Sequence, residues 1–343
     1  MQDLRGMYYS ELEELIISLG EPKYRAGQVY KWISSGVSSI DEMSNIPASL
    51  RAKLKENAGL YSPKVLSRLV SADGTVKYLW ELADGNAVET VLMKYKTGNT
   101  VCISSQVGCR MGCRLCASTI GGLVRNLTPA DFLSEVLMTE KDSGEKISKI
   151  VIMGIGEPLD NYDNVMKFLR LVNAPEGMNI GMRHITLSTC CIPDKLRKLM
   201  DENLQITLAI SLHAAENGLR TELMPSNKAC GLDTLLELAG EYYKKTGRRI
   251  TFEYAMISGI NDSVKHASLL ADAALSCGAH LNLIPLNKVE ESPFGPSTKK
   301  AMNEFTDVLG KRGANYTIRR SLGGDVNASC GQLRRNREKS RNK

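Results

Sequence analysis

The chain has 343 residues, of which 43% are hydrophobic and 24% are charged, and its formal net charge is +6. This composition is ordinary for a globular protein with one large domain and a smaller one. No signal-peptide pattern opens the chain and no stretch reaches the roughly 18 apolar residues of a membrane span, so the protein is expected to stay in the cytoplasm.

Residues 1–60 are predicted to form a helical accessory domain. Three segments carry apolar residues at spacings of three and four, with Gly or Pro between them: residues 9–20, 24–36 and 48–59. From 64 to 95 the apolar spacing changes to every second residue, interrupted by Asp73-Gly74 and Asp84-Gly85. Because Asp-Gly pairs favour tight turns, residues 61–97 are predicted to form a three-stranded β meander.

From residue 98 onward, short apolar segments alternate with amphipathic ones. Strands are expected within 101–105, 149–156, 184–189, 205–213, 249–257, 281–286 and 316–320, and helices within 130–141, 164–172, 233–245, 265–275 and 299–312. Buried strands separated by crossover helices predict an α/β fold whose parallel sheet curls into a full or partial barrel. In such folds the chemistry lies in loops at the carboxyl ends of the strands.

A loop directly after the first of these strands contains Cys109, Cys113 and Cys116. In a reducing compartment, cysteines grouped in this way indicate a metal centre or catalysis rather than disulfides. With Cys102 or a histidine as a fourth ligand, they could complete a zinc site. They could instead hold a four-iron cluster with one iron left open to another ligand. The residues alone leave both alternatives open.

This C-x3-C-x2-C spacing, followed by GIGEP (154–158) at the end of the next strand, resembles the radical S-adenosylmethionine superfamily. Other segments resemble its RlmN-type adenine methyltransferases of ribosomal and transfer RNA: YRAGQVYKWI (24–33), ISSQVGC (103–109), GCRLCAST (112–119), RNLTP (125–129), MGIGEPLDNYDNV (153–165), HITLST (184–189), ISLHA (210–214), LNLIPLN (281–287) and NASCGQL (327–333). The resemblance implies a partial (β/α)6-type barrel, here residues 98–333, behind the helical accessory domain and the meander.

The resemblance also implies the reaction, which is methylation of adenine C2 in 23S rRNA and in tRNA. C2 lies between two ring nitrogens and its hydrogen has no useful acidity, so it cannot attack the methyl group of a sulfonium, and radical chemistry is needed. The implied cofactors are a [4Fe-4S] cluster on the three cysteines and two S-adenosylmethionine molecules per turnover. A monomer and an electron donor such as flavodoxin or ferredoxin are expected.

Individual roles follow from the same resemblance. Cys330 would store a methyl group, Glu89 would accept the C2 proton, and Cys102 would release the product through a Cys102–Cys330 disulfide. S-adenosylmethionine would be bound by Gly156, Glu157, Ser188, Ser211, Leu212, His213 and Asn287. The strand pattern alone would instead place Glu89 facing solvent. The family's usual glycine after the Ser-Thr strand is replaced here by Cys190 and Cys191, whereas Cys230 and Cys277 are interpreted as structural thiols.

The last ten residues, 334–343, hold six Lys or Arg and the single Glu338, and so contribute +5. Such a tail can bind a phosphate backbone or can simply be a solvated end. Two rival functions stay open: a C8-specific adenine methyltransferase of the resistance type, and a zinc-stabilised RNA-binding protein without catalysis. The second would leave GIGEP and Cys330 unexplained.

Overall fold

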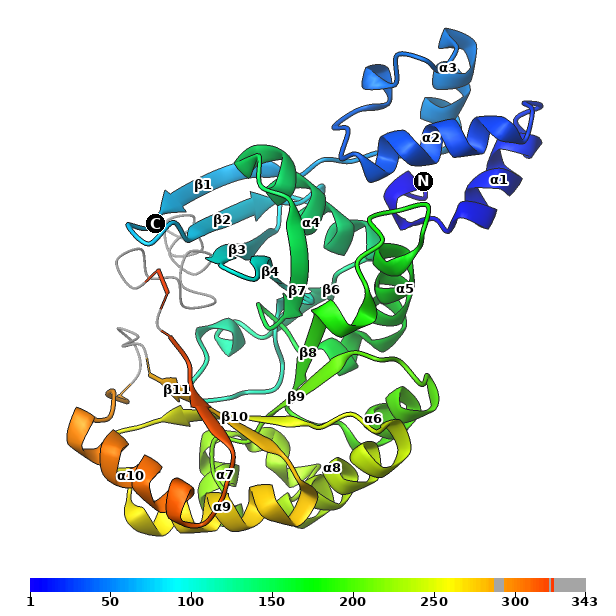
Figure 1. Ribbon diagram of the computed structural model, residues 1–343. Helices are drawn as coiled ribbons and strands as arrows, with labels where there is room; N and C mark the ends of the chain where they lie inside the picture. Colours follow the sequence, from blue (N-terminus) through cyan, green and yellow to red (C-terminus); the bar gives the residue numbers. More distant parts are fainter. Residues whose placement is uncertain (287–292, 321, 324–343) are drawn as a thin grey trace.

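The computed structural model describes residues 1–286, 293–320 and 322–323 (Figure 1). The amino-terminal region forms the three predicted helices, α1 (Tyr9–Ser18), α2 (Tyr24–Ser34) and α3 (Ala48–Asn57). They bury a hydrophobic core of their own, whose fully buried members are Leu4, Leu12, Ile16, Ala26, Val29, Met43, Leu50 and Leu54. A separate core is what a distinct accessory module requires.

A buried arginine joins this module to the rest of the chain. The Arg5 guanidinium donates to the hydroxyl of Ser62 at 3.0 Å, to the hydroxyl of Ser134 at 3.3 Å, and to the carbonyls of Val37 and Tyr61. Ser134 belongs to α4 (Pro129–Ser143), the first helix of the core. Because a buried guanidinium needs most of its donors satisfied, these bonds fix the module against α4.

Within the described residues, ten strands form one sheet in the order β1-β2-β3-β4-β7-β8-β9-β10-β11-β12. Their bounds are β1 Lys64–Val70, β2 Val76–Glu81, β3 Ala87–Tyr95, β4 Gly98–Ile103, β7 Ile147–Ile152, β8 Ile185–Thr189, β9 Thr207–Ser211, β10 Thr251–Met256, β11 His280–Pro285 and β12 Tyr316–Ile318. β1 to β4 pair antiparallel, and all pairs from β4 to β12 are parallel. The predicted meander is therefore confirmed, and it continues directly into the parallel sheet.

The helices of the core cover the outer face of the curved sheet (Figure 1). They are α4, α5 (Tyr162–Asn173), α6 (Pro193–Asp201), α7 (Asn217–Leu223), α8 (Leu232–Thr246), α9 (Val264–Cys277) and α10 (Lys299–Lys311). Outward side chains such as Val101, Ile103 and Ile152 join the main hydrophobic core beneath these helices. Within the described residues the sheet stays open between β1 and β12, which confirms the partial-barrel prediction. No helix of this described part is long and apolar enough to cross a bilayer.

A small hairpin that the sequence pattern did not predict holds the cysteine loop. β5 (Gln106–Gly108) pairs antiparallel with β6 (Leu123–Asn126), and the Cys109 amide donates to the carbonyl of Gly122 at 3.0 Å. The loop between them is thus closed at its base. The two strands have three and four residues, which is too short for a clear period-two signal, so the sequence pattern does not predict the hairpin.

Candidate active site

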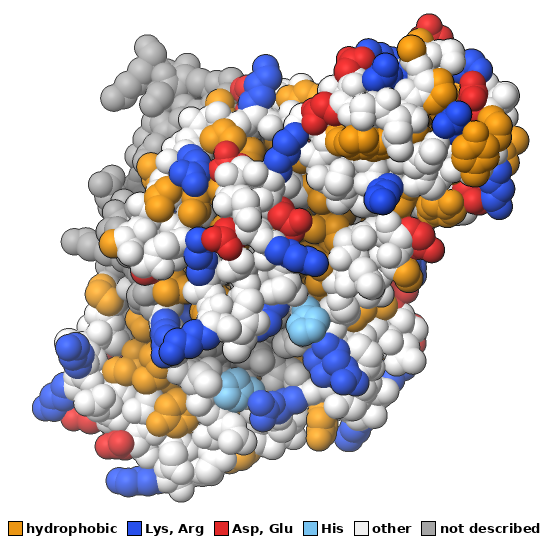
Figure 2. Space-filling view, turned by 45° about the horizontal axis from the view of Figure 1, so that its top comes forward, with side chains coloured by type: hydrophobic (Ala, Val, Ile, Leu, Met, Phe, Trp, Pro, Cys, Tyr) orange, Lys and Arg blue, Asp and Glu red, His pale blue; other side chains and the backbone are white. Residues whose placement is uncertain are grey.

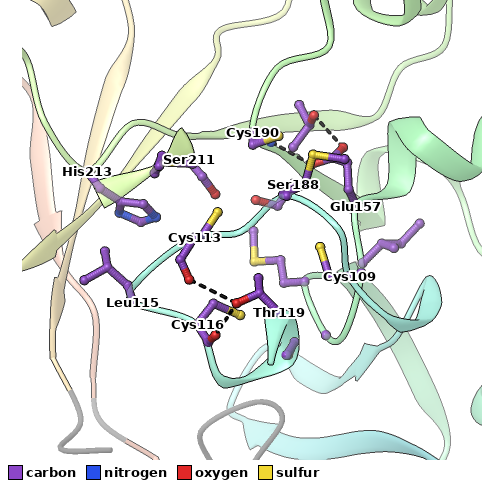
Figure 3. Close-up of a pocket in the computed structure, with 18 residues that line it drawn as sticks. Cys109, Cys113, Leu115, Cys116, Thr119, Glu157, Ser188, Cys190, Ser211 and His213 are labelled. Atoms are coloured by element: carbon purple, nitrogen blue, oxygen red, sulfur yellow. Dashed lines mark hydrogen bonds between the residues drawn. The ribbon is translucent and has the colours of Figure 1, made fainter. Parts of the chain in front are cut away.

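A cavity lies where β7, β8 and β9 end, as expected from the position of chemistry in such folds (Figure 3). The cysteine loop forms one wall and the ends of the strands form the other. Its lining includes Cys109, Cys113, Cys116, Gly156, Glu157, Ser188, Cys190, Ser211 and His213. The structure therefore brings together the three predicted cluster cysteines and five of the predicted cofactor-binding residues.

The three cysteines of the loop are held in place by backbone contacts. The Thr119 hydroxyl donates to the carbonyl of Cys113 at 3.2 Å and to that of Cys116 at 3.0 Å. Burial raises the pKa of Cys109 and of Cys113 to about 12, so both are neutral thiols until a metal displaces their protons. Among the described residues no group of three His, Cys, Asp or Glu side chains is spaced for a metal ion, so the cluster ligands stay a prediction that the shared cavity supports.

Two glycines let the end of β7 approach the end of β4 closely. A Cβ on Gly154 would lie 2.7 Å from the carbonyl oxygen of Ile103. A Cβ on Gly156 would lie 2.6 Å from the Gln106 Cβ and 2.6 Å from the Ser105 hydroxyl, and Gly156 has φ +109°. Only glycine tolerates both the contact and the dihedral angle. GIGEP thus forms a tight backbone cradle that faces the cysteines.

Gly156→Ala is expected to lower the free energy of unfolding by about 2–4 kcal/mol and to abolish S-adenosylmethionine binding, because the added methyl group displaces the cradle. Urea unfolding and equilibrium dialysis measure the two effects. Gly240→Ala is the matched control: Gly240 lies inside α8, and a Cβ added there would have no other atom within 4 Å, so this change should leave binding intact and stability equal or higher. A Gly156→Ala protein with unchanged stability and binding would contradict this account.

The Glu157 carboxylate connects this cradle to the end of β8. It accepts hydrogen bonds from the Thr189 hydroxyl at 2.6 Å, the Leu159 amide at 3.0 Å and the Cys190 amide at 2.8 Å. Burial raises the pKa of Glu157, while these bonds favour its ionised form. The side chain is therefore held rigidly at the cavity wall.

His213 presents a single defined tautomer to the cavity. It follows β9 with φ +56°, and its Nδ1 accepts the Ala255 amide hydrogen at 3.0 Å. Burial, together with the nearby Arg220, lowers the pKa of His213 to about 4, so the ring is neutral near pH 7. A neutral ring whose Nδ1 is an acceptor carries its proton on Nε2, which leaves Nε2–H as a donor for a ligand.

A buried arginine that sequence reasoning missed braces the strand ends behind the cavity. The Arg220 guanidinium donates to the carbonyls of Cys190 at 3.1 Å, Ser211 at 3.3 Å and Cys230 at 3.2 Å. Arg220 is fully buried. Its position in a short helix after β9 offered no sequence signal beyond an ordinary charged residue.

After β8, the second residue of the Cys190–Cys191 pair has a glycine-like backbone conformation. Cys191 has φ +77°, which is a left-handed conformation that favours glycine. Its sulfur lies 3.3 Å from the sulfur of Cys230, and both thiols are buried. Cys230 therefore packs against a specific thiol partner, which the sequence did not indicate, while Cys277 is buried in the main core.

Glu89, the predicted base, and Cys102, the thiol predicted to release the product, lie on one face of the sheet. Cys102 on β4 lies opposite Val91 on β3, and Glu89 precedes Val91 by two residues, so all three side chains point to the same side. Glu89 is only 3% exposed, which shows that its solvent-facing interpretation from the strand pattern was wrong. β3 is covered on both of its faces.

Glu89 and Cys102, on β3 and β4, are not among the residues that line the cavity, and three further predicted residues are not placed there by the structure. The Leu212 side chain is fully buried in the main hydrophobic core and does not line the cavity. Asn287 and Cys330 lie outside the described residues. The Cys102–Cys330 disulfide therefore stays a prediction.

Comparison with known proteins agrees with this geometry. Residues 2–60 match the ribosomal RNA large subunit methyltransferase N-terminal domain, and residues 103–270 match the radical SAM superfamily. The chain is 49% identical to the probable dual-specificity RNA methyltransferase RlmN of Clostridium tetani, over 100% of this chain and 99% of the relative. It is 51% identical to the protein of the same description from Desulforamulus reducens, over 98% of this chain and 97% of the relative.

A solved structure extends the likeness to the fold. The crystal structure of a radical SAM methyltransferase from Sphaerobacter thermophilus superimposes with a TM-score of 0.93 at 38% identity, covering 97% of this chain and 99% of that one. The two proteins thus share one architecture over 97% of this chain. The chain belongs to the RlmN family of dual-specificity RNA methyltransferases, within the radical SAM superfamily.

Proposed function

We propose that this protein methylates C2 of adenine in 23S rRNA and in tRNA. The observation that carries the proposal is the single cavity in which the thiols of C-x3-C-x2-C face the GIGEP cradle, Ser188, Ser211 and His213. Full-length relatives named dual-specificity RNA methyltransferases support the same activity. A purely zinc-binding loop would need neither the cradle nor the strand-end hydroxyl groups.

The cavity suits the two cofactors of the superfamily. Cys109, Cys113 and Cys116 would hold a [4Fe-4S] cluster, and the cradle, the two serine hydroxyls and the Nε2–H of His213 would bind S-adenosylmethionine. Once bound, this cofactor pair supplies a carbon radical that can take hydrogen from a methyl group. The fixed carboxylate of Glu157 and the bracing by Arg220 keep the binding wall rigid.

The remaining steps belong to the chain itself. Cys330 stores a methyl group as a thioether, that methyl group gives up one hydrogen atom, and the resulting methylene carbon bonds to adenine C2. The adduct then gives up one electron, which the bound cluster would accept. Glu89 then accepts the proton that leaves C2. The Cys102 thiolate attacks the sulfur of Cys330, the sulfur–carbon bond breaks with its electron pair on the carbon, and that carbon takes a proton to become the methyl product. A Cys102–Cys330 disulfide remains, and a cellular thiol must reduce it before the next turnover.

The inner face of the sheet offers a route for the target nucleotide. A groove of about 560 Å³ is lined by residues of β3, β4 and β7 to β12, and it shares Met153 with the cofactor cavity. Lys149, Arg183 and Arg319 line it, and in Figure 2 Lys, Arg and His side chains flank a hollow in the core. A basic rim suits phosphates, and an adenine in folded RNA must be flipped out to reach the cavity. A cytoplasmic location and an external electron donor fit this role.

Deleting residues 334–343 is expected to weaken RNA binding and to reduce the slope of log affinity against log salt by about 3 to 5, because five net charges are removed. Filter binding at several salt concentrations measures the slope. Methylation at saturating RNA should persist. If the slope is unchanged, the tail is a solvated end.

Nucleoside mass spectrometry tests the proposed position directly. Expression of this protein in a host that lacks its own adenine-C2 methyltransferase should restore 2-methyladenosine in 23S rRNA and in tRNA. A Cys330→Ala variant is the control and should restore none. Recovery of 8-methyladenosine would instead support the C8-specific rival, and absence of both would refute the proposal.

A further inference from the structure

A fully buried lysine contacts the predicted catalytic base. The Lys77 ammonium nitrogen lies 3.1 Å from Oε2 of Glu89, and the two side chains are 0% and 2% exposed. Lys77 is on β2, opposite Val91 of β3, whereas Glu89 lies opposite Leu79. The two charged residues are thus diagonal neighbours on one face of the sheet.

The surroundings of this pair are mostly apolar. Lys77, Val91 and Cys102 form one row across β2, β3 and β4. Val91 and Cys102 also belong to a small buried cluster with Met93, against which Val151, Met153 and Leu322 pack. Removing two charges from water is costly, and direct contact between the ammonium and the carboxylate offsets part of that cost.

Other titratable groups lie near Glu89 without replacing Lys77. The Cys102 thiol shares its face on β4. Glu135 of α4 lies on the other face, where its carboxylate accepts bonds from the Thr90 hydroxyl at 2.6 Å and the Ser104 amide at 3.1 Å. Neither of these groups carries a positive charge. Lys77 is thus a cation that the described part of the structure places in direct contact with the base.

We propose that Lys77 is a positioning residue that keeps Glu89 ionised and oriented to accept the C2 proton. The inference rests on the proposed function, in which Glu89 is the base. A buried carboxylate without a nearby cation is driven to its neutral form, and a neutral carboxyl group cannot accept a proton. During turnover the proton passes from C2 to Glu89, Lys77 keeps its own protons, and Glu89 returns its proton to solvent.

The test compares rate–pH profiles of RNA methylation. In Lys77→Met the methylation rate near pH 7 should fall by about tenfold or more. The acidic limb of its rate–pH profile should move to higher pH, so that the rate partly recovers at alkaline pH. Lys77→Gln should show the same displacement, and Lys77→Arg should keep the wild-type limb. Glu89→Gln should stay inactive at every pH. A Lys77→Met profile that matches the wild type, or one that matches Glu89→Gln at every pH, would overturn the proposal.

One further readout and one control variant separate this role of Lys77 from misfolding. Methylation of Cys330 precedes the Glu89 step, so intact-protein mass should show normal methyl loading in Lys77→Met. Lys94→Met is the matched control: Lys94 on β3 pairs with Glu145 at 2.6 Å, but both side chains are well exposed, so its profile should not change.

A double-mutant cycle of unfolding free energies tests the Lys77–Glu89 pair without measuring the reaction. Its outcome is therefore independent of the proposed function. Lys77→Met should lower the free energy of unfolding, and adding Glu89→Gln should recover much of the loss, because the second change removes the buried charge that Lys77 contacts. Strictly additive losses would overturn the pairing. Failure of the wild-type protein to methylate RNA would refute the proposed function instead.

Discussion

Alanine at any one of Cys109, Cys113 or Cys116 is expected to abolish iron–sulfur absorbance and all methylation. One loop, closed by the β5–β6 hairpin, directs the three thiols into one cavity, and a four-iron cluster with one open position needs all three as ligands. Anaerobic purification followed by iron and sulfide analysis measures the loss. The expected effect on activity is complete, because radical formation has no substitute within the chain.

Cys277→Ala is the control for this series. Cys277 ends α9 and is buried in the main core, so its removal should leave iron and sulfide unchanged. Full iron and sulfide in a triple variant of the loop cysteines would contradict the assignment. Stoichiometric zinc without sulfide in the wild-type protein would favour the structural zinc alternative.

Cys102→Ala is expected to trap the protein on its RNA. Its proposed task is limited to the last step, so Cys330 should still be methylated and should still become bonded to adenine. Release then fails, and cells should accumulate a covalent complex that joins Cys330 to RNA through one methylene group. Denaturing gels and intact mass should show a nuclease-sensitive increase. Cys330→Ala should show no complex, because no methyl group is stored.

The double variant Cys102→Ala/Cys330→Ala should behave like Cys330→Ala, since a later step cannot matter when an earlier one is missing. If Cys102→Ala turns over normally with no complex, the role assigned to Cys102 is wrong. Cys190 would then be the next thiol to test because it lines the cofactor cavity, whereas Cys191 packs against Cys230.

Most of the architecture could be predicted from the sequence because the spacing of apolar residues within each segment indicates whether it forms a helix or a strand. Apolar periodicity located the three amino-terminal helices, the meander and the strands of the parallel sheet, which the structure confirms. Other elements escaped: the β5–β6 hairpin is short, and α7 has seven residues with Gly218 near its start. Helix α6 was also missed, although Leu196, Leu199 and Met200 bury one face of it. Motif resemblance, rather than periodicity, identified the residues that line the cavity.

The burial and the contacts of individual side chains could not be predicted from the sequence, because they depend on how the sheet curls. Because side chains alternate between the two faces of a strand, Glu89 and Val88 are expected on opposite faces of β3. This alternation does not reveal that both faces of β3 are covered. Burial of Glu89, and with it the contact to Lys77, follows only from the packed structure. The bracing by Arg220 likewise requires three carbonyl groups that come together only in the folded chain.

The most direct measurement of the central claim is methylation of RNA with S-adenosylmethionine whose methyl group is fully deuterated. Storage on Cys330 followed by hydrogen abstraction removes one deuterium, and solvent supplies a hydrogen when Cys102 releases the product. The account predicts that mass spectrometry finds adenine carrying a methyl group with two deuteriums at C2. A methyl group with all three deuteriums would show direct transfer and would contradict the account.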